Sequence, residues 1–77
     1  MLKQLFGSLM NTMIEVNVIN NEGYDKVMEL IDMFKSCEHV EINERGFYSN
    51  IWFTVNNRDA KSVKKILSKL DSVISYK

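Results

Sequence analysis

Proline is absent from this 77-residue chain, which holds only one cysteine, one histidine and three glycines. A single cysteine excludes an intramolecular disulfide and fits a reducing compartment. The few glycines form neither a phosphate-binding loop nor a dinucleotide fingerprint. No apolar run approaches the length of a bilayer span, and the N-terminus lacks a signal-peptide core with a cleavage site. We therefore expect a cytoplasmic protein that does not act at a membrane.

The length and composition predict one small globular domain. Hydrophobic residues make up 45% of the chain, which is ordinary for a globular protein and too high for a disordered one. So short a chain buries a shallow core, and a partner chain often supplies what is missing. Lysine far outnumbers arginine, and asparagine and isoleucine are frequent. This composition hints at an AT-rich bacterial or phage gene.

The net charge of zero hides a strong asymmetry along the chain. Residues 1–44 carry three lysines against eight carboxylates, a net charge of −5. Residues 45–77 carry seven basic residues against two aspartates, a net charge of +5. Opposite charges on separate parts of a molecule can steer partners or promote head-to-tail association, although solvated helix faces also account for such a pattern.

The segment 47–55 reads as a β-strand with two unlike faces. The expected core face comprises Phe47, Ser49, Ile51, Phe53 and Val55, and the expected polar face comprises Tyr48, Asn50, Trp52 and Thr54. The polar face thus carries two large aromatic side chains, one of them the only tryptophan. Aromatic side chains in such positions are usually covered by another surface.

Periodicity and turn residues predict the remaining elements. We expect an N-terminal amphipathic helix within residues 1–11 and strands at 13–19, 40–43 and 73–77. Two further helices should span residues 24–36 and begin at Asn57, with Asn21 and Asn57 as their N-caps. A tight turn is expected at residues 44–46. The second of these two helices should bury Ala60, Val63, Ile66, Leu67 and Leu70 and expose a basic face of Lys61, Lys64, Lys65 and Lys69.

This order predicts an α+β sandwich domain over residues 12–77. Right-handed crossovers applied to β-α-β-β-α-β give a ferredoxin-like antiparallel sheet with strand order 4-1-3-2 and two helices on one face. Tyr48 and Trp52 should then lie centrally on the open sheet face, beside Glu15 and Asn17.

The chain offers little for catalysis or metal binding. Cys37 and His39 are the only thiol and imidazole, whereas a zinc site needs about four ligands and a nucleophilic cysteine needs further partners. Glu38, Glu41 and Glu44 are typical of a charged edge strand that discourages pairing with other sheets. We therefore expect no enzyme activity, no cofactor and no metal.

Two short stretches resemble known families. The run from Arg45-Gly-Phe-Tyr48 through Trp52 resembles the third strand of an RNA-recognition motif, in which outward aromatic side chains stack on bases. Tyr48 replaces the glycine or alanine of that motif, and Glu15 and Asn17 stand where an aromatic side chain is expected, which argues against a nucleic-acid partner. The turn at residues 20–24 is similar to that of ACT-type regulatory domains, which share this plan and bind small ligands near the turn.

The N-terminal helix has three possible roles. Its apolar residues Leu2, Leu5, Phe6 and Leu9 could cover the open sheet face, bind another chain, or rest on a membrane, for which a single lysine is a weak signal. These residues, together with Glu15, Asn17, Tyr48, Asn50 and Trp52, form the candidate partner-binding set. The resulting hypothesis is a small non-enzymatic regulator or inhibitor that binds itself or a host protein, for example an accessory protein of a phage or mobile element. The alternatives are a dimeric ACT-like sensor and an RNA or single-stranded DNA binder.

Overall fold

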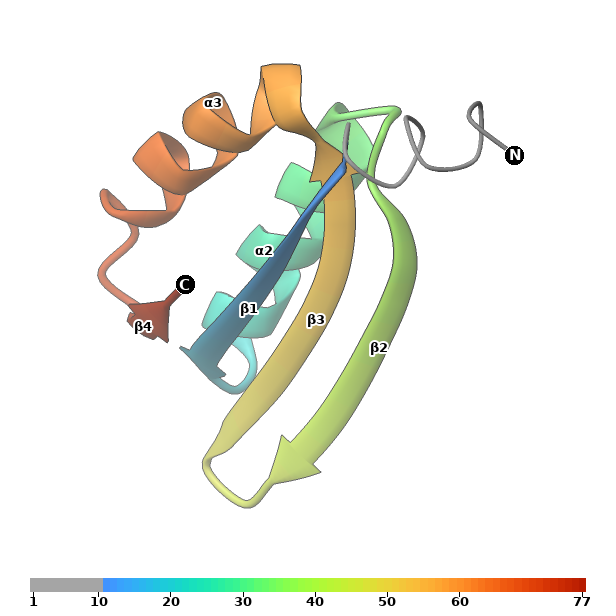
Figure 1. Ribbon diagram of the computed structural model, residues 1–77. Coiled ribbons are helices and arrows are strands. Elements are labelled where there is room, and N and C mark those ends of the chain that lie inside the picture. Colours follow the sequence, from blue (N-terminus) through green and yellow to red (C-terminus); the bar gives the residue numbers. More distant parts are fainter. Residues whose placement is uncertain (1–10) are drawn as a thin grey trace.

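A computed structural model describes residues 11–77 (Figure 1). The elements in chain order are β1 (Asn11–Ile19), α2 (Glu22–Met33), β2 (Glu38–Arg45), β3 (Tyr48–Asn56), α3 (Asn57–Leu67) and β4 (Val73–Tyr76). The predicted helix at residues 1–11 lies outside the described residues except for Asn11, which begins β1. The protein is thus a small α+β structure with two helices and four strands in its described part.

The four strands form one antiparallel sheet in the order β2-β3-β1-β4. Counted from the β4 edge, the strand order is β4-β1-β3-β2. The two long strands β1 and β3 lie at the centre, where Glu15 opposes Trp52 and Asn17 opposes Asn50. The centre of the sheet therefore displays the residues that alternate along β1 and β3, and the two edges belong to β2 and β4.

Both helices cover the same face of the sheet, and the core lies between the two layers (Figure 1). The alternating residues of β1 and β3 supply one side of this core, and the apolar stripes of α2 and α3 supply the other. The buried apolar side chains are Ile14, Val16, Val18, Val27, Leu30, Ile31, Ile51, Phe53, Val55, Ala60, Val63 and Leu67. Ile66 and Leu70, which the sequence places in the same stripe, are only partly buried.

The turn between β2 and β3 corrects the position predicted for Phe47. Gly46 and Phe47 form a two-residue hairpin turn, and Gly46 has a φ angle of +83°, which glycine tolerates best. Phe47 therefore leaves the alternation of β3 and is 73% exposed instead of facing the core. The hairpin also lengthens β2 beyond the predicted residues 40–43 at both ends.

Asn21 takes its predicted N-cap position, whereas the predicted N-cap Asn57 is replaced by its neighbour Asn56. Helix α3 is capped by Asn56, whose side chain accepts a hydrogen bond from the backbone N–H of Arg58 at 2.9 Å, and Asn57 is the first helical residue. Asn21 occupies the N-cap position of α2 with a φ angle of 69°, but its side chain makes no capping hydrogen bond. Helix α2 also starts and ends earlier than predicted, at Glu22 and Met33.

Asn20 connects the turn after β1 to the β2–β3 hairpin. Its side chain accepts a hydrogen bond from the hydroxyl of Ser49 and donates one to the backbone carbonyl of Gly46. Its backbone N–H donates to the carbonyl of Phe47 at 2.9 Å. Ser49 is the only buried polar residue in the described part of the chain, so this contact also satisfies its hydroxyl.

Gly23 provides a test of the packing between α2 and the turn before β4. A Cβ atom at this position would lie 2.9 Å from the Cβ of Ser72, whose carbonyl is held by the N–H of Ile19. The clash in Gly23→Ala should therefore lower the free energy of unfolding by about 1–3 kcal/mol. The higher helix propensity of alanine offsets at most about 1 kcal/mol of this loss.

Urea denaturation measures this change, and Ser72→Gly provides the matched background. Removing the Ser72 side chain should relieve most of the clash, so Gly23→Ala should cost less in the Ser72→Gly protein than in the wild type. Equal costs in the two backgrounds would show that the contact with Ser72 does not limit the size of residue 23.

Candidate functional site

The face of the sheet opposite the helices displays the aromatic side chains singled out from the sequence. Tyr48, Asn50 and Trp52 alternate with the buried residues of β3, and Glu15 and Asn17 do the same on β1. All five side chains are half-buried. The structure brings them together across the two central strands, and we call this set the aromatic face.

A chain of hydrogen bonds fixes the polar groups of the aromatic face. The side-chain amide of Asn50 donates to the carboxylate of Glu15 at 2.9 Å and to the side-chain carbonyl of Asn17 at 2.8 Å. The carbonyl oxygen of Asn50 in turn accepts a hydrogen bond from the indole N–H of Trp52. The Asn17 amide continues the chain to Ser75 of β4 at 3.0 Å. The Trp52 ring is thus held by a network that spans three strands.

Apolar groups extend the aromatic face toward the hairpin end of the sheet. Tyr48 contacts the ring of Phe47 edge-on, with ring centroids 5.3 Å apart and an angle of 60° between the rings. A shallow depression beside them is lined by Asn17, Phe47, Tyr48 and Ile74. Ile74 of β4 is 52% exposed, so apolar surface continues across the sheet in this region.

The charges on this side of the sheet are mixed. A second shallow depression is lined by the five residues of the aromatic face together with Asn43 and Arg45 of β2. Glu41 opposes Trp52 across the β2–β3 pair, just as Glu15 opposes it from β1. Trp52 therefore lies between two strands that each bring a carboxylate opposite it.

The predicted basic face lies elsewhere, on α3 and on the turn after it, because α3 ends at Leu67 and Lys69 lies in that turn. Lys61, Lys65 and Lys69 are exposed and Lys64 is half-buried, and α3 belongs to the helix layer on the other side of the sheet. The structure therefore does not bring these lysines together with the aromatic face. Leu2, Leu5, Phe6 and Leu9 belong to the candidate set but lie outside the described residues.

Cys37 lies just before β2, and His39 is the second residue of that strand. Burial raises the pKa of the Cys37 thiol, and the carboxylate of Asp59 raises it further. The thiol therefore stays protonated at neutral pH and is a weak nucleophile. His39 is exposed, with its Nε2 atom 3.7 Å from the carboxylate of Glu38. Within residues 11–77, no group of three or more histidine, cysteine, aspartate or glutamate side chains is arranged to hold a metal ion.

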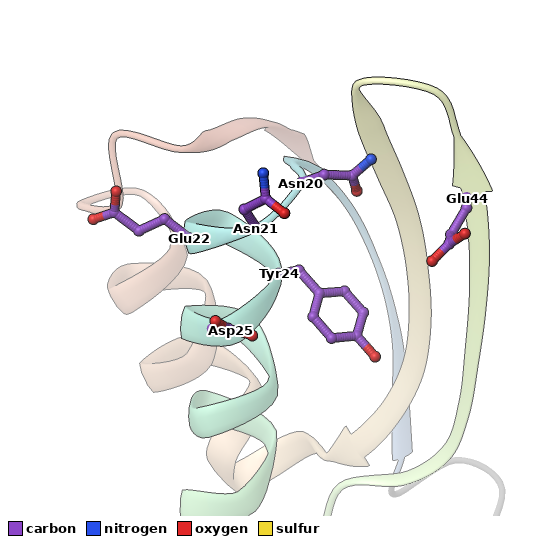
Figure 2. Close-up of a pocket in the computed structure, with 6 residues that line it drawn as sticks. All are labelled: Asn20, Asn21, Glu22, Tyr24, Asp25 and Glu44. Carbon is purple, nitrogen blue, oxygen red and sulfur yellow. The ribbon is translucent and has the colours of Figure 1, made fainter.

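A hollow lies beside the turn between β1 and α2, where the sequence resembles ACT-type domains. It is lined by Asn20, Asn21, Glu22, Tyr24, Asp25 and Glu44. Figure 2 shows the Tyr24 ring projecting from α2 toward the β2–β3 hairpin, with the Glu44 carboxylate directed into the same space. Three of the six residues carry carboxylates, so the hollow has a negative potential.

None of the helices described for this chain is both long enough and apolar enough to cross a membrane. Comparisons of the chain with protein-family models, with curated proteins and with solved structures found no match.

Sequence reasoning placed the aromatic face but missed part of its surroundings. Asn43 and Arg45 of β2 and Ser75 of β4 border the same surface through the sheet register. Alternation along β2 and β4 was the sequence pattern that could have placed these three residues on the open sheet face. It was weak because most residues of these two edge strands are exposed on both sides.

Proposed function

We propose that this protein is a non-enzymatic protein-binding regulator that engages its partner through the aromatic face. The observation that carries the proposal is the half-buried, hydrogen-bonded Trp52 at the centre of a sheet face that neither helix covers. Interface centres are enriched in tryptophan and tyrosine, and a fixed side chain loses little conformational entropy on binding. The surrounding polar groups would form the rim of such an interface.

The partner is a second copy of this chain or a host protein. The element order β-α-β-β-α-β and the neighbours in the sheet support a ferredoxin-like plan for the fold. The small size, the composition and the mixed charge of the aromatic face support a cytoplasmic accessory protein, such as an inhibitor encoded by a phage or mobile element.

Affinity purification from host lysate tests the proposal when it is paired with variants of matched character. Trp52→Ala removes the centre of the aromatic face, whereas Met33→Ala removes an exposed apolar side chain from α2, where Met33 is 70% exposed. A protein retained by the wild type and by Met33→Ala but lost with Trp52→Ala supports the proposed interface. A protein retained equally by all three contradicts it.

A small-ligand sensor is the second candidate, and the hollow beside the β1–α2 turn favours it. Its lining of Glu22, Asp25 and Glu44 suits a ligand with a positively charged amino group. Such a ligand should raise the melting temperature in proportion to the logarithm of its concentration. Glu44→Gln should weaken this effect, whereas Trp52→Ala should leave it intact.

A nucleic-acid binder is the third candidate, using the stacking surface of Tyr48 and Trp52. Affinity for RNA or single-stranded DNA should then fall steeply with added salt. Glu15 and Glu41 opposite Trp52 would repel phosphate groups, so this candidate has less support from the geometry.

Cys37→Ser and His39→Ala should leave partner binding unchanged, because neither residue belongs to the aromatic face. Binding isotherms of the two variants should overlay that of the wild type. A loss of binding in either variant, with the melting temperature preserved, would show that the start of β2 takes part in function.

A further inference from the structure

The helix layer leaves one strand of the sheet uncovered. Helices α2 and α3 pack against β1, β3 and β4, and Figure 1 shows β2 at the outer edge of the sheet, away from both helices. Ile42 opposes the buried Ile51 of β3, so its side chain points to the helix side of the sheet. It remains 37% exposed there, and Val40 is 39% exposed. Ile42 therefore presents apolar surface on the helix side of β2 without a covering element among residues 11–77, and the exposed Val40 lies next to it in the irregular stretch between Glu38 and Glu41.

The edge of this uncovered surface is acidic. Glu44 opposes the buried Ser49 and so shares the helix side of β2 with Ile42. Across the hollow, α2 contributes Tyr24 and Asp25, and Figure 2 shows Glu44 and Tyr24 directed into the same space. Helix α2 also carries the exposed carboxylates Glu22, Glu29 and Asp32, and its only lysine, Lys26, is paired with Glu22 at 3.2 Å. We call the surface of Tyr24, Asp25, Val40, Ile42 and Glu44 the β2 groove.

The geometry of β2 favours a helix over a strand as the occupant. The pairing of β2 with β3 shifts register between Glu38 and Glu41, and His39 has a φ angle of +55° in this irregular stretch. Bulges and like charges along an edge both oppose the addition of another strand. A helix, in contrast, would continue the existing helix layer and cover Ile42 without using the edge backbone groups.

We propose that the β2 groove binds a cationic amphipathic helix of a partner protein. The apolar face of that helix would cover Ile42 and Val40, and its lysine or arginine side chains would lie against Glu44 and Asp25. Charge complementarity selects such a partner, because the same carboxylates would repel an acidic helix. The groove lies on the opposite side of the sheet from the aromatic face, so the inference does not depend on the function proposed for that face.

A synthetic peptide of about 15 residues, with leucine at helical spacing and lysine elsewhere, is the probe. The controls are a peptide of the same composition with scrambled leucines and one with glutamate in place of lysine. Titration into the full-length protein, followed by backbone-amide NMR, should give saturable shifts in α2 and β2 for the first peptide alone. Added salt should weaken its affinity.

Variants separate the groove from other surfaces. Ile42→Ser and Glu44→Gln should each lower the affinity for the peptide by about tenfold. Ile74→Ser, on the other edge strand, should leave this affinity unchanged. Glu44→Gln changes an exposed carboxylate and should fold normally. It therefore still tests the proposal if Ile42→Ser destabilises the protein. Four results would each overturn the proposal. The scrambled peptide could bind equally well, or the chemical shift changes could centre on Trp52. The β2 edge amides could become protected, as expected for an added strand, or Glu44→Gln could bind the peptide with wild-type affinity.

Discussion

Replacing Phe53 with alanine is expected to lower the free energy of unfolding by about 3–5 kcal/mol. Phe53 is fully buried and lies opposite Ile14 at the centre of the sheet. No other fully buried side chain in the described residues is larger. Native proteins are stable by about 5–15 kcal/mol, and small domains lie toward the lower end, so the loss is a large share of the total stability. Urea denaturation followed by circular dichroism measures the change.

Phe47→Ala is the matched control, because it removes the same ring from an exposed turn. Phe47 is 73% exposed, so its replacement should alter stability by about 0.5 kcal/mol or less. Comparable losses in the two variants would contradict the assignment of Phe53 to the core and of Phe47 to the turn. Large losses in both variants would mean that Phe47 shares the core face with Phe53, and small losses in both would mean that the alternation of β3 is shifted by one residue.

Replacing Trp52 with alanine has the second large expected effect, a loss of about 2 kcal/mol or more, or roughly 30-fold in a binding constant. The substitution removes the ring and the N–H group that donates to Asn50. If residues 1–10 cover the aromatic face, the loss should appear in the stability of a monomer. If another chain covers it, the loss should appear in the dissociation constant of the complex.

Concentration dependence distinguishes these outcomes. A self-association through the aromatic face should weaken on dilution in sedimentation experiments, whereas an intramolecular cover should give the same melting temperature at all concentrations. Trp52→Phe is the control, because it keeps an aromatic ring but lacks the indole N–H. A monomer that tolerates Trp52→Ala without loss of stability or of any partner would remove the basis of the proposed function.

The order of the elements could be predicted because each one follows a clear local rule. Alternation along β1 and β3 and the helical spacing of Ala60, Val63 and Leu67 match the buried residues of the structure. The errors lie at the ends of elements. Alternation continues through Phe47 in the sequence, but the hairpin turn interrupts it there, so the pattern alone could not show that Phe47 leaves the sheet.

The candidate site was only partly predictable. The faces of β1 and β3 follow from their alternation, which placed Glu15, Asn17, Tyr48, Asn50 and Trp52 on one surface. The hydrogen bonds through Asn50 depend on the register between the two strands, which the sequence does not state. The uncovered helix side of β2 depends on how far the helices extend across the sheet, and this is a property of the packed structure alone.

The contact between Asn20 and Ser49 has a consequence for how the sheet selects its alignment. The inward residues of β3 alternate regularly, so moving β3 by two residues along β1 would keep every apolar side chain on the core face. Hydrophobic patterning alone therefore permits several alignments of the central pair. Only the native one gives the buried Ser49 hydroxyl its acceptor on Asn20. A shifted alignment loses this acceptor, so the contact between Ser49 and Asn20 favours the native register over its neighbours.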